Sequence, residues 1–318
     1  MQRLISGRGS ETVSSNPTPI AKESSKSAPI QIGDTTIQRI VEQEGAFFDA
    51  FEFFPNLTQE MLDENRDWLY PLFFKPGSTH FNLCVQSYLV RTPHHTILID
   101  TCVGNHKPRK ARAFWDNLAS DQYEKNLAAA GVSVDDIDMV MCTHLHTDHV
   151  GWNTRLENGR WVPTFPNARY VFTEKELNFW TERHAADEAA APWITDSVLP
   201  IVAAQRCDLV ENNHMLTDGI QLIASPGHTI DHCSVLVSRS GQEALITGDM
   251  IHSPLQARYP ELGMMSDYDS PQAGRSRRQI FDRFMDTPAL MCTSHFPQPS
   301  TGRFERWDDA YRFVPVAT

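Results

Sequence analysis

The hydrophobic residues of this chain fall into short runs that end in polar or glycine-containing turns, and stretches with helical spacing separate several of these runs. Runs of apolar and β-branched residues predict strands at 85–91, 96–101, 138–142, 169–172, 220–224 and 289–293, and a hairpin at 233–246. Helical spacing predicts helices at 58–68, 120–130, 174–183, 195–206 and 273–285. The alternation of strands and helices predicts an α/β fold in which helices cover the outer faces of sheets.

The first part of the chain has a different composition. Residues 1–29 are rich in serine and proline with scattered lysine and glutamate, which predicts a disordered N-terminal arm. They contain no apolar segment of the length that a secretory signal needs, and no stretch of the chain approaches the roughly 20 apolar residues of a membrane helix. With 318 residues and 41% hydrophobic content, the chain can bury a large core. We therefore expect one folded domain at 30–318 behind the arm.

The segment 30–79 is crowded with aromatic residues, and such a cluster needs a covering surface. One interpretation is a lid of loops with a short helix, capped by Thr58 and packed on the domain's own core. The other is a dimer contact or one wall of an apolar substrate pocket, and both interpretations can hold together. The residues concerned are Phe47, Phe48, Phe51, Phe53, Phe54, Trp68, Tyr70, Phe73 and Phe74.

Charge and cysteine content narrow the choice of partners and location. The formal net charge of -12 and the pI near 5.5 argue against binding to nucleic acid or to an anionic membrane surface. The six cysteines have no CxxC spacing, and most lie in apolar runs where a free thiol behaves as a small buried hydrophobe. A disulfide framework is uncommon in a chain of this size. We therefore expect reduced thiols, a cytoplasmic location and a small-molecule partner.

The densest chemical signal is the segment 143–149, THLHTDH, which follows the predicted strand 138–142. Neutral imidazole and carboxylate are ligands that suit zinc and its first-row neighbours. His144 and His146 alternate on an extended segment and can converge on one ion, whereas Asp148 and His149 point toward a second. A lone His-x-His pair would be a weak indication, because solvated or core histidines are commoner than ligands.

Three later segments repeat the arrangement of a polar residue directly after an apolar run. They are SPGHT at 225–229, TGD at 247–249 and TSH at 293–295. In the order HxHxDH, GHT, GD and a late histidine, the chain from about Leu83 to His295 resembles the metallo-β-lactamase-fold hydrolase superfamily. The resemblance implies an αββα sandwich, with 30–318 as the catalytic domain and with metals at one edge of the sheets.

The resemblance also implies a ligand set. It assigns one ion to His144, His146 and His228, the second ion to Asp148, His149 and His295, and the bridge between them to Asp249. Charge agrees with this assignment, because two cations held close together need an anionic ligand between them. We expect two divalent ions in each chain, with zinc as the first choice and manganese, iron or cobalt as alternatives.

Two such ions would lower the pKa of a shared water toward about 7, so that a metal-bridging hydroxide is available as the nucleophile. Members of the superfamily suggest that Asp148 doubles as a proton shuttle. His252 stands three residues after Asp249, where similar lactone-hydrolysing members have a tyrosine that touches the substrate. It would serve as a catalytic general acid or bond a backbone oxygen. We expect His232 to orient a ligand rather than to bind metal.

The flanks of the metal motifs predict a pocket for a substrate with an apolar group. Its mouth would comprise Trp152, Trp161, Tyr259 and Met264 or Met265, although the two tryptophans can equally pack a loop. The likeness to acyl-homoserine lactonases makes hydrolysis of a lactone or carboxylic ester the first expectation. Phosphotriester hydrolysis is the alternative, because the chain also resembles methyl-parathion-type hydrolases.

Other activities of the superfamily fit less well. The most similar β-lactamases have no bridging carboxylate, and a thioesterase like glyoxalase II would need a basic tail that is not evident here. A flavodiiron protein needs a flavin domain for which the chain has no room, and a persulfide dioxygenase needs only one iron. A non-catalytic binding module would have lost a ligand, and none is missing.

Overall fold

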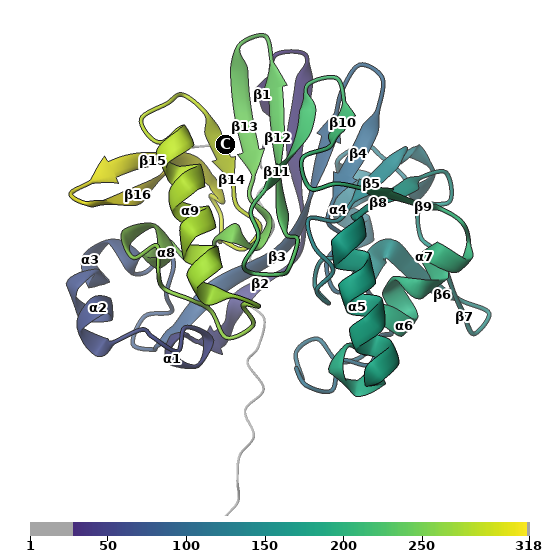
Figure 1. Cartoon of the computed structure of the whole chain (residues 1–318), viewed down its shortest axis with the longest axis horizontal. Coiled ribbons are helices and arrows are strands. Elements are labelled where there is room, and N and C mark those ends of the chain that lie inside the picture. The colour runs from purple at the N-terminus through teal and green to yellow at the C-terminus, as the bar shows by residue number, and fades with distance from the viewer. Residues whose placement is uncertain (1–27, 317–318) are drawn as a thin grey trace, which may run out of the picture.

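Two seven-stranded sheets lie at the centre of the molecule, and helices flank them (Figure 1). The computed structural model describes residues 28–316, so nearly all of the predicted arm at 1–29 lies outside the described residues. The first sheet has the order β1-β2-β3-β4-β5-β8-β9 and the second the order β10-β11-β12-β13-β14-β15-β16. This arrangement confirms the predicted αββα sandwich.

The first sheet is antiparallel over its first four strands and parallel from β4 to β9. Its strands are β1 (Ile30–Ile32), β2 (Thr35–Asp49), β3 (His80–Arg91), β4 (Thr96–Ile99), β5 (Met139–Met141), β8 (Arg169–Thr173) and β9 (Cys207–Val210). A separate two-stranded sheet consists of β6 (Thr154–Glu157) and β7 (Arg160–Pro163).

The second sheet is antiparallel except where β13 pairs with β14. Its strands are β10 (Met215–Thr217), β11 (Ile220–Ala224), β12 (Cys233–Arg239), β13 (Gln242–Ile246), β14 (Leu290–Cys292), β15 (Thr301–Trp307) and β16 (Ala310–Pro315). Because β11, β13 and β14 run in the same direction, the loops at their carboxyl ends meet at one edge of this sheet.

The helices are short except for α5 and α9. They are α1 (Ala50–Phe53), α2 (Gln59–Glu64), α3 (Arg66–Leu69), α4 (Gln122–Ala129), α5 (Glu174–Ala186), α6 (Trp193–Ser197), α7 (Leu199–Ala203), α8 (Leu255–Arg258) and α9 (Ser270–Phe284), with single 3-10 turns at Val134–Asp136, Gly151–Asn153, Glu188–Ala190 and Gly248–Met250. Helix α9 packs on the second sheet, where the Phe281 ring lies 4.3 Å from that of Phe304. Helix α4 packs on β2, where Asn126 donates a hydrogen bond to the Val41 carbonyl.

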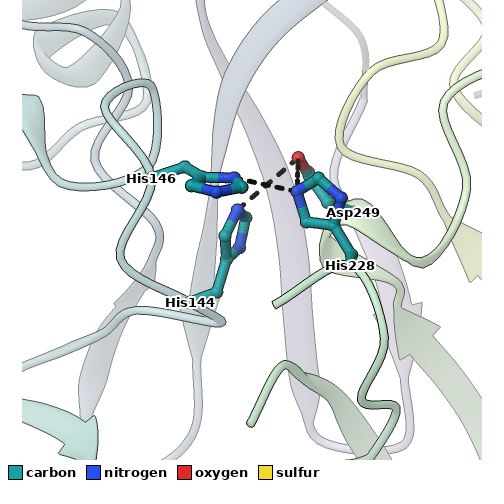
Figure 2. A group of neighbouring side chains, drawn as sticks. All are labelled: His144, His146, His228 and Asp249. Atoms are coloured by element: carbon teal, nitrogen blue, oxygen red, sulfur yellow. Dashed lines mark hydrogen bonds and ion pairs between the residues drawn. The ribbon is translucent and has the colours of Figure 1, made fainter. Parts of the chain in front are cut away.

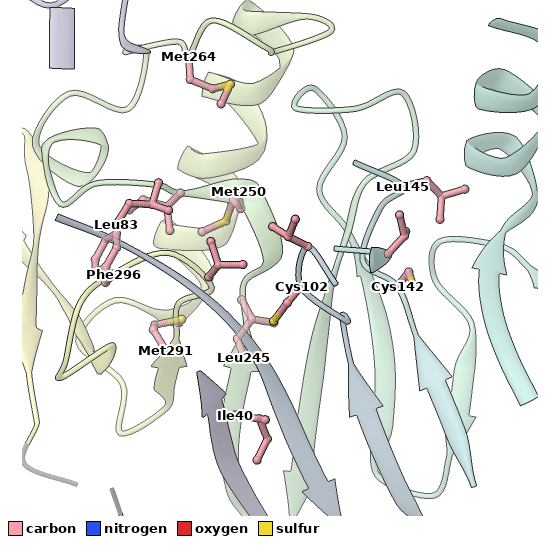
Figure 3. Close-up of a cluster of buried hydrophobic side chains, with 14 of the residues drawn as sticks. Ile40, Leu83, Cys102, Cys142, Leu145, Leu245, Met250, Met264, Met291 and Phe296 are labelled. Carbon is pink, nitrogen blue, oxygen red and sulfur yellow. The ribbon is translucent and has the colours of Figure 1, made fainter. Parts of the chain in front are cut away.

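Alternation of side chains along the strands divides the core into two clusters. The cluster between the sheets includes Ile37, Tyr88, Val90, Ile97, Ile99 and Met141 from the first sheet, and Leu222, Val235, Val237, Ala244 and Ile246 from the second. The larger cluster lies under the helices and extends toward the loops that end the strands, as Leu145, Met250 and Met264 show (Figure 3). Packing on both faces therefore fixes the strand ends that carry the polar loops.

The segment 30–79 is more regular than predicted. Its first part forms β1 and the long strand β2, not loops, and only the part after Asp49 consists of short helices and turns. Thr58 caps α2 as predicted, with its hydroxyl 3.2 Å from the Met61 N–H. The aromatic side chains pack against the domain's own core, and Phe48 and Phe53 also line a cavity. The dimer contact stays a prediction.

Two predicted helices have different ends. The predicted helix 195–206 is divided into α6 and α7, with Val198 between them. Helix α4 begins after Asp121, and the predicted cap Ser120 accepts a hydrogen bond from the Gln122 N–H.

All six cysteines lie within the described residues, and none is paired with another. Within residues 28–316, no helix has the length and apolar character needed to cross a membrane.

Candidate metal centre

The seven residues that the sequence singles out as metal ligands come together at one edge of the two sheets. The loop after β5 carries His144, His146, Asp148 and His149, whereas His228 follows β11, Asp249 follows β13 and His295 follows β14. A backbone hydrogen bond of 3.1 Å from Cys233 to Thr143 joins the two sheets beside these loops.

The side chains form two adjoining groups, each with its ligand atoms within 4.8 Å of one another. One group is His144, His146, His228 and Asp249 (Figure 2), and the other is Asp148, His149 and His295. In the first group, Nδ1 of His146 lies 2.9 Å from Nε2 of His228, and Nε2 of His144 lies 3.6 Å from Oδ2 of Asp249. These groups bring together the residues that the resemblance assigns to each ion, and a third group of described residues, Asp249, His252 and His295, overlaps both.

Asp249 contacts both groups with different oxygen atoms. Its Oδ2 lies 3.2 Å from Nε2 of His228, whereas its Oδ1 lies 3.0 Å from Nε2 of His149 and 2.8 Å from Nε2 of His295. One oxygen for each group is the geometry of a carboxylate that bridges two cations.

The donor atoms fit divalent ions. Nε2 of His144, Nε2 of His149 and Oδ1 of Asp249 are buried, and none of them has a hydrogen-bond partner among the described residues. Buried polar atoms without partners are costly, and one cation in each group would satisfy them. Five imidazoles and two carboxylates suit zinc, and they also suit manganese, iron or cobalt.

Each histidine except His146 is oriented through Nδ1, which leaves Nε2 facing the centre. The partners are the Thr143 hydroxyl at 3.1 Å for His144, Asp100 at 2.9 Å for His149, Asp267 at 3.0 Å for His228 and the Cys84 carbonyl at 2.8 Å for His295. Such partners fix the ring orientation of metal-binding histidines. His146 presents Nδ1 to the centre instead.

The protonation states of these groups are set by burial and by their mutual charges. Burial lowers the pKa of His144 and of His146 well below the usual range. For His228, burial opposes the charged form, but the hydrogen bonds to Asp249 and Asp267 outweigh it and raise the pKa to about 9. Protons on such histidines balance the carboxylates in the absence of a cation, and a metal ion would replace them.

His232 orients Asp249, in agreement with its predicted role as an orienting neighbour. Its Nε2 accepts a hydrogen bond of 2.9 Å from the Asp249 N–H, while Nδ1 lies 2.8 Å from the Ser225 hydroxyl. Burial lowers the pKa of His232 to about 3, so the ring is neutral. Gly248 has a φ of +54°, and a Cβ there would lie 2.5 Å from the ring of His232. Glycine is therefore needed for this contact.

Three buried acids that sequence reasoning missed hold the ligand-bearing loops. Asp100 follows β4 and bonds His149 and the Thr143 N–H, so the rule that found the other ligands, a polar residue after an apolar run, applies to it as well. Glu176 in α5 accepts from the Leu145 and Asp231 amides. Glu42 in β2 accepts from the amides of Val103 and Gly104 and from the Trp152 indole.

A cavity of about 600 Å³ lies against the two groups, and its wall includes His146, Asp148, His228, Asp249, His252 and His295. Half of the remaining residues in the wall are aromatic or methionine, namely Phe48, Phe53, Trp115, Phe179, Trp180, Trp193, Met264, Met265 and Tyr268. This size and lining are typical of a small-molecule pocket.

Of the residues predicted at the pocket mouth, only the two methionines lie there. Trp152 is 3% exposed and stacks on Tyr123 with ring centres 5.1 Å apart, so it packs a loop, as the alternative interpretation holds. Trp161 lies under the Lys107 ammonium, and Tyr259 lines a separate cavity. The predicted mouth is therefore wrong for these three residues.

His252 lies beside the centre in the wall of the cavity. Its Nε2 is 3.0 Å from Oδ2 of Asp249, and its ring stacks on that of His295 with an angle of 10°. Its Nδ1 is buried and has no hydrogen-bond partner in the described part of the chain, so the predicted bond to a backbone oxygen is absent there. Burial lowers the pKa of His252 to about 4, which favours the neutral ring.

The fold and this donor set define a metallohydrolase of the metallo-β-lactamase type. The model of the metallo-β-lactamase superfamily matches residues 41–295, and the chain belongs to that superfamily. An N-acyl homoserine lactonase of Bacillus cereus is 24% identical over 232 residues, which cover 69% of this chain and 84% of that protein. The lactonase AiiB of Agrobacterium fabrum is 26% identical over 54% of this chain and 65% of its own length.

Solved structures agree on the fold over nearly the whole chain. A crystal structure of the hydrolase AbOPH, of the beta-lactamase superfamily, has a TM-score of 0.77 at 25% identity and covers 93% of this chain and 99% of that one. AidC, a dizinc quorum-quenching lactonase solved with the product N-hexanoyl-L-homoserine, has a TM-score of 0.74 at 22% identity, with 92% and 97% covered.

Proposed function

We propose that the protein is a dinuclear metal-dependent hydrolase of lactones or carboxylic esters that carry an apolar group. The observation that supports this most directly is Asp249, which faces one group of ligands with Oδ2 and the other with Oδ1. The seven residues His144, His146, Asp148, His149, His228, Asp249 and His295 would hold two divalent ions, with zinc as the first choice. The curated relatives named as lactonases favour an acyl substrate.

Two bound ions would supply a nucleophile at neutral pH and polarise the substrate's oxygen. The chain's own residues position the substrate and handle the proton. Asp148 is 12% exposed at its side chain and lines the cavity, so it can pass a proton between the centre and the leaving group. His252, which contacts Oδ2 of Asp249 whereas His149 contacts Oδ1, can hydrogen-bond the carbonyl or leaving oxygen. The aromatic wall would bind the apolar group and exclude water.

Metal content is the first test. Protein grown with zinc or manganese should contain about two ions per chain, and a chelator should abolish its hydrolase activity. Less than half an ion per chain would contradict the proposal. One iron per chain with thiol-dependent oxygen uptake would instead indicate a persulfide dioxygenase.

A substrate panel is the second test. One metal-loaded preparation would be assayed with acyl-homoserine lactones, simple lactones, aryl esters, a phosphotriester and a β-lactam. We expect a lactone or ester to be the best substrate. Turnover of the phosphotriester far faster than every ester would favour the alternative of phosphotriester hydrolysis.

The role of His252 is tested on the best substrate of the panel. His146→Ala should abolish turnover, and His252→Ala should lower kcat by about 10² for a poor leaving group and little for a good one. Full kcat in His252→Ala with every leaving group would remove His252 from the mechanism and leave the metal assignment intact.

A further inference from the structure

The substrate pocket contains donor groups that the metal centre does not use. Arg112 and Arg183 line its wall, and within residues 28–316 neither guanidinium forms an ion pair with a carboxylate. The acids in the wall are Asp148, Asp249 and Asp267, and all three belong to the metal centre or hold His228. Both residues therefore line the cavity without an ion-pair partner among the described residues, with Arg112 half-buried and Arg183 exposed.

Arg112 is held in place by neutral groups alone. Its Nη2 lies 3.7 Å from the sulfur of Met265, its Nη1 lies 3.3 Å from the Ala111 carbonyl, and its guanidinium carbon is 5.5 Å from the centre of the Phe48 ring. These contacts fix the side chain beside the pocket mouth while leaving most of its five N–H donors free. A planar guanidinium with free donors suits a carboxylate, which it binds through two parallel hydrogen bonds.

Trp115 lies in the same turn of chain and in the same wall as Arg112. The backbone N–H of Trp115 donates to the Arg112 carbonyl at 2.9 Å, and the residue is 6% exposed. The indole Nε1 is buried and has no acceptor among the described residues, although Trp180 and Trp193 in the same wall donate to Glu176 and to the Leu145 carbonyl. The Nε1 atom is enclosed by protein, so this N–H does not face a ligand in the cavity, although other atoms of Trp115 form part of the wall.

Arg183 adds a second cation from the last turn of α5, where its guanidinium carbon lies 5.9 Å from the Trp180 ring centre. We propose that the pocket selects esters or lactones whose apolar body carries a carboxylate remote from the bond that is cleaved. Arg112 is the principal partner of that carboxylate, and Arg183 adds charge. This inference rests on the proposed hydrolase function for its substrate class.

The kinetic test compares para-nitrophenyl hexanoate with mono-para-nitrophenyl adipate, which have acyl chains of equal length and differ in the terminal carboxylate. The suberate and sebacate half-esters vary the distance between the two groups. Wild-type enzyme should prefer one of the half-esters in kcat/KM, mainly through a lower KM. Arg112→Met should reduce that preference at least about tenfold, because a hydrogen-bonded charge pair is lost.

Matched variants separate charge from packing. Arg112→Met keeps an apolar stem against Phe48 and Met265, Arg112→Lys keeps the charge without the paired donors, and Trp115→Phe removes only the N–H. We expect Arg112→Lys to retain part of the preference and Trp115→Phe to leave it unchanged, because the indole N–H is enclosed by protein. Arg258→Met is the control, because Arg258 also stacks on an aromatic ring but lies outside this pocket. An unchanged preference in Arg112→Met would overturn the inference.

A binding experiment tests the inference without hydrolysis. Calorimetry on zinc-loaded protein would compare the mono-N-methylamide of adipic acid with N-methylhexanamide, and the variant Arg112→Met separates recognition by the arginine from capture by the metals. The acid should bind about tenfold more tightly to the wild type, and Arg112→Met should remove the difference. Equal affinities of the wild type for both amides would overturn the inference. If no ester or lactone is hydrolysed, the proposed function fails, but this binding result still decides the recognition of the carboxylate.

Discussion

Nδ1 of His228 lies 3.0 Å from Oδ1 of Asp267, and the other oxygen of that carboxylate accepts the Met264 N–H at 2.9 Å. Asp267 thus joins a candidate metal ligand to the loop that carries Met264, Met265 and Tyr268 into the pocket wall. Two backbone bonds tighten this connection, since the N–H groups of Tyr268 and Asp269 donate to the carbonyls of His228 and Gly227. The geometry of the metal centre and the shape of the pocket therefore depend on each other.

The first prediction concerns Asp267. Asp267→Ala removes the acceptor that orients the His228 ring and the anchor of the Met264 amide, so both metal affinity and substrate binding should suffer. We expect zinc affinity to fall by about 10–100-fold, with a raised KM for apolar substrates at saturating zinc. Competitive zinc titration and steady-state kinetics measure the two effects. The exposed Asp308→Ala is the control, and unchanged affinity in Asp267→Ala would show that Asp267 does not orient His228.

The second prediction concerns how the two candidate sites share their ligands. Asp249→Ala removes an oxygen from both groups and should weaken both ions, whereas His295→Ala should mainly empty the group of Asp148 and His149. The first group keeps three imidazoles of its own in that variant. Elemental analysis of the purified variants decides the matter. Equal retention of two ions in both variants would mean that the ligand assignment is wrong.

A third prediction concerns Glu176, which ties two ligand-bearing loops to α5. Its Oε1 accepts from the Leu145 amide at 3.2 Å and from the Trp180 indole at 2.7 Å, and its Oε2 accepts from the Asp231 amide at 3.2 Å. In Glu176→Gln the side-chain NH₂ must face a donor, so we expect a loss of about 1–3 kcal/mol in the free energy of unfolding and weaker zinc binding. Urea unfolding and zinc titration test this.

The control for that experiment lies on the same helix, two residues earlier. Glu174 is exposed at the start of α5, so Glu174→Gln should leave both the free energy of unfolding and the zinc affinity close to those of the wild type. A similar loss in both variants would show that the effect reflects the charge of α5 and not the tie between the loops.

The candidate metal ligands were predictable because their segments follow apolar runs, and because their order along the chain is distinctive. His144 follows the run that forms β5, Asp249 the run that forms β13, and His295 the run that forms β14. Buried strands determine where the loops at their ends lie. The two-sheet architecture was predictable for the same reason, since the runs and the helices alternate along the chain.

Other features depend on tertiary contacts that leave no local signal. Strand β2 buries polar residues such as Arg39 and Glu42 and ends among aromatic residues, so its alternation is obscured. Glu176 lies within a helix and Asp267 within a loop, where an acid is ordinarily exposed to solvent. Only packing against Leu145 and His228 makes them parts of the site. The sequence left open whether Trp152 lines the pocket or packs a loop, because proximity in sequence to the metal motif does not determine which way a side chain points.

A fourth prediction follows from Glu42, whose carboxylate holds the loop after β4 to the Trp152 indole. Burial raises the pKa of Glu42 to about 7 from the usual value of 4.5. Between these values the folded protein binds a proton that the unfolded chain has released, so the free energy of unfolding falls as pH rises. The total loss is on the order of 3 kcal/mol between pH 4.5 and pH 7, and it is complete above pH 7.

Glu42→Gln cannot titrate, so the difference in the free energy of unfolding between the wild type and this variant isolates the contribution of Glu42. The wild type should lose stability relative to Glu42→Gln as the pH rises from about 5 to about 8, since the slope of the difference is set by the one proton that Glu42 retains in the folded state. Urea unfolding of both proteins over this range, with the exposed Glu52→Gln as control, measures it. If the difference in the free energy of unfolding stays constant with pH, Glu42 is ionised in the folded protein throughout this range. The hydrogen bonds from the amides of Val103 and Gly104 and from the Trp152 indole would then offset the effect of burial on its pKa.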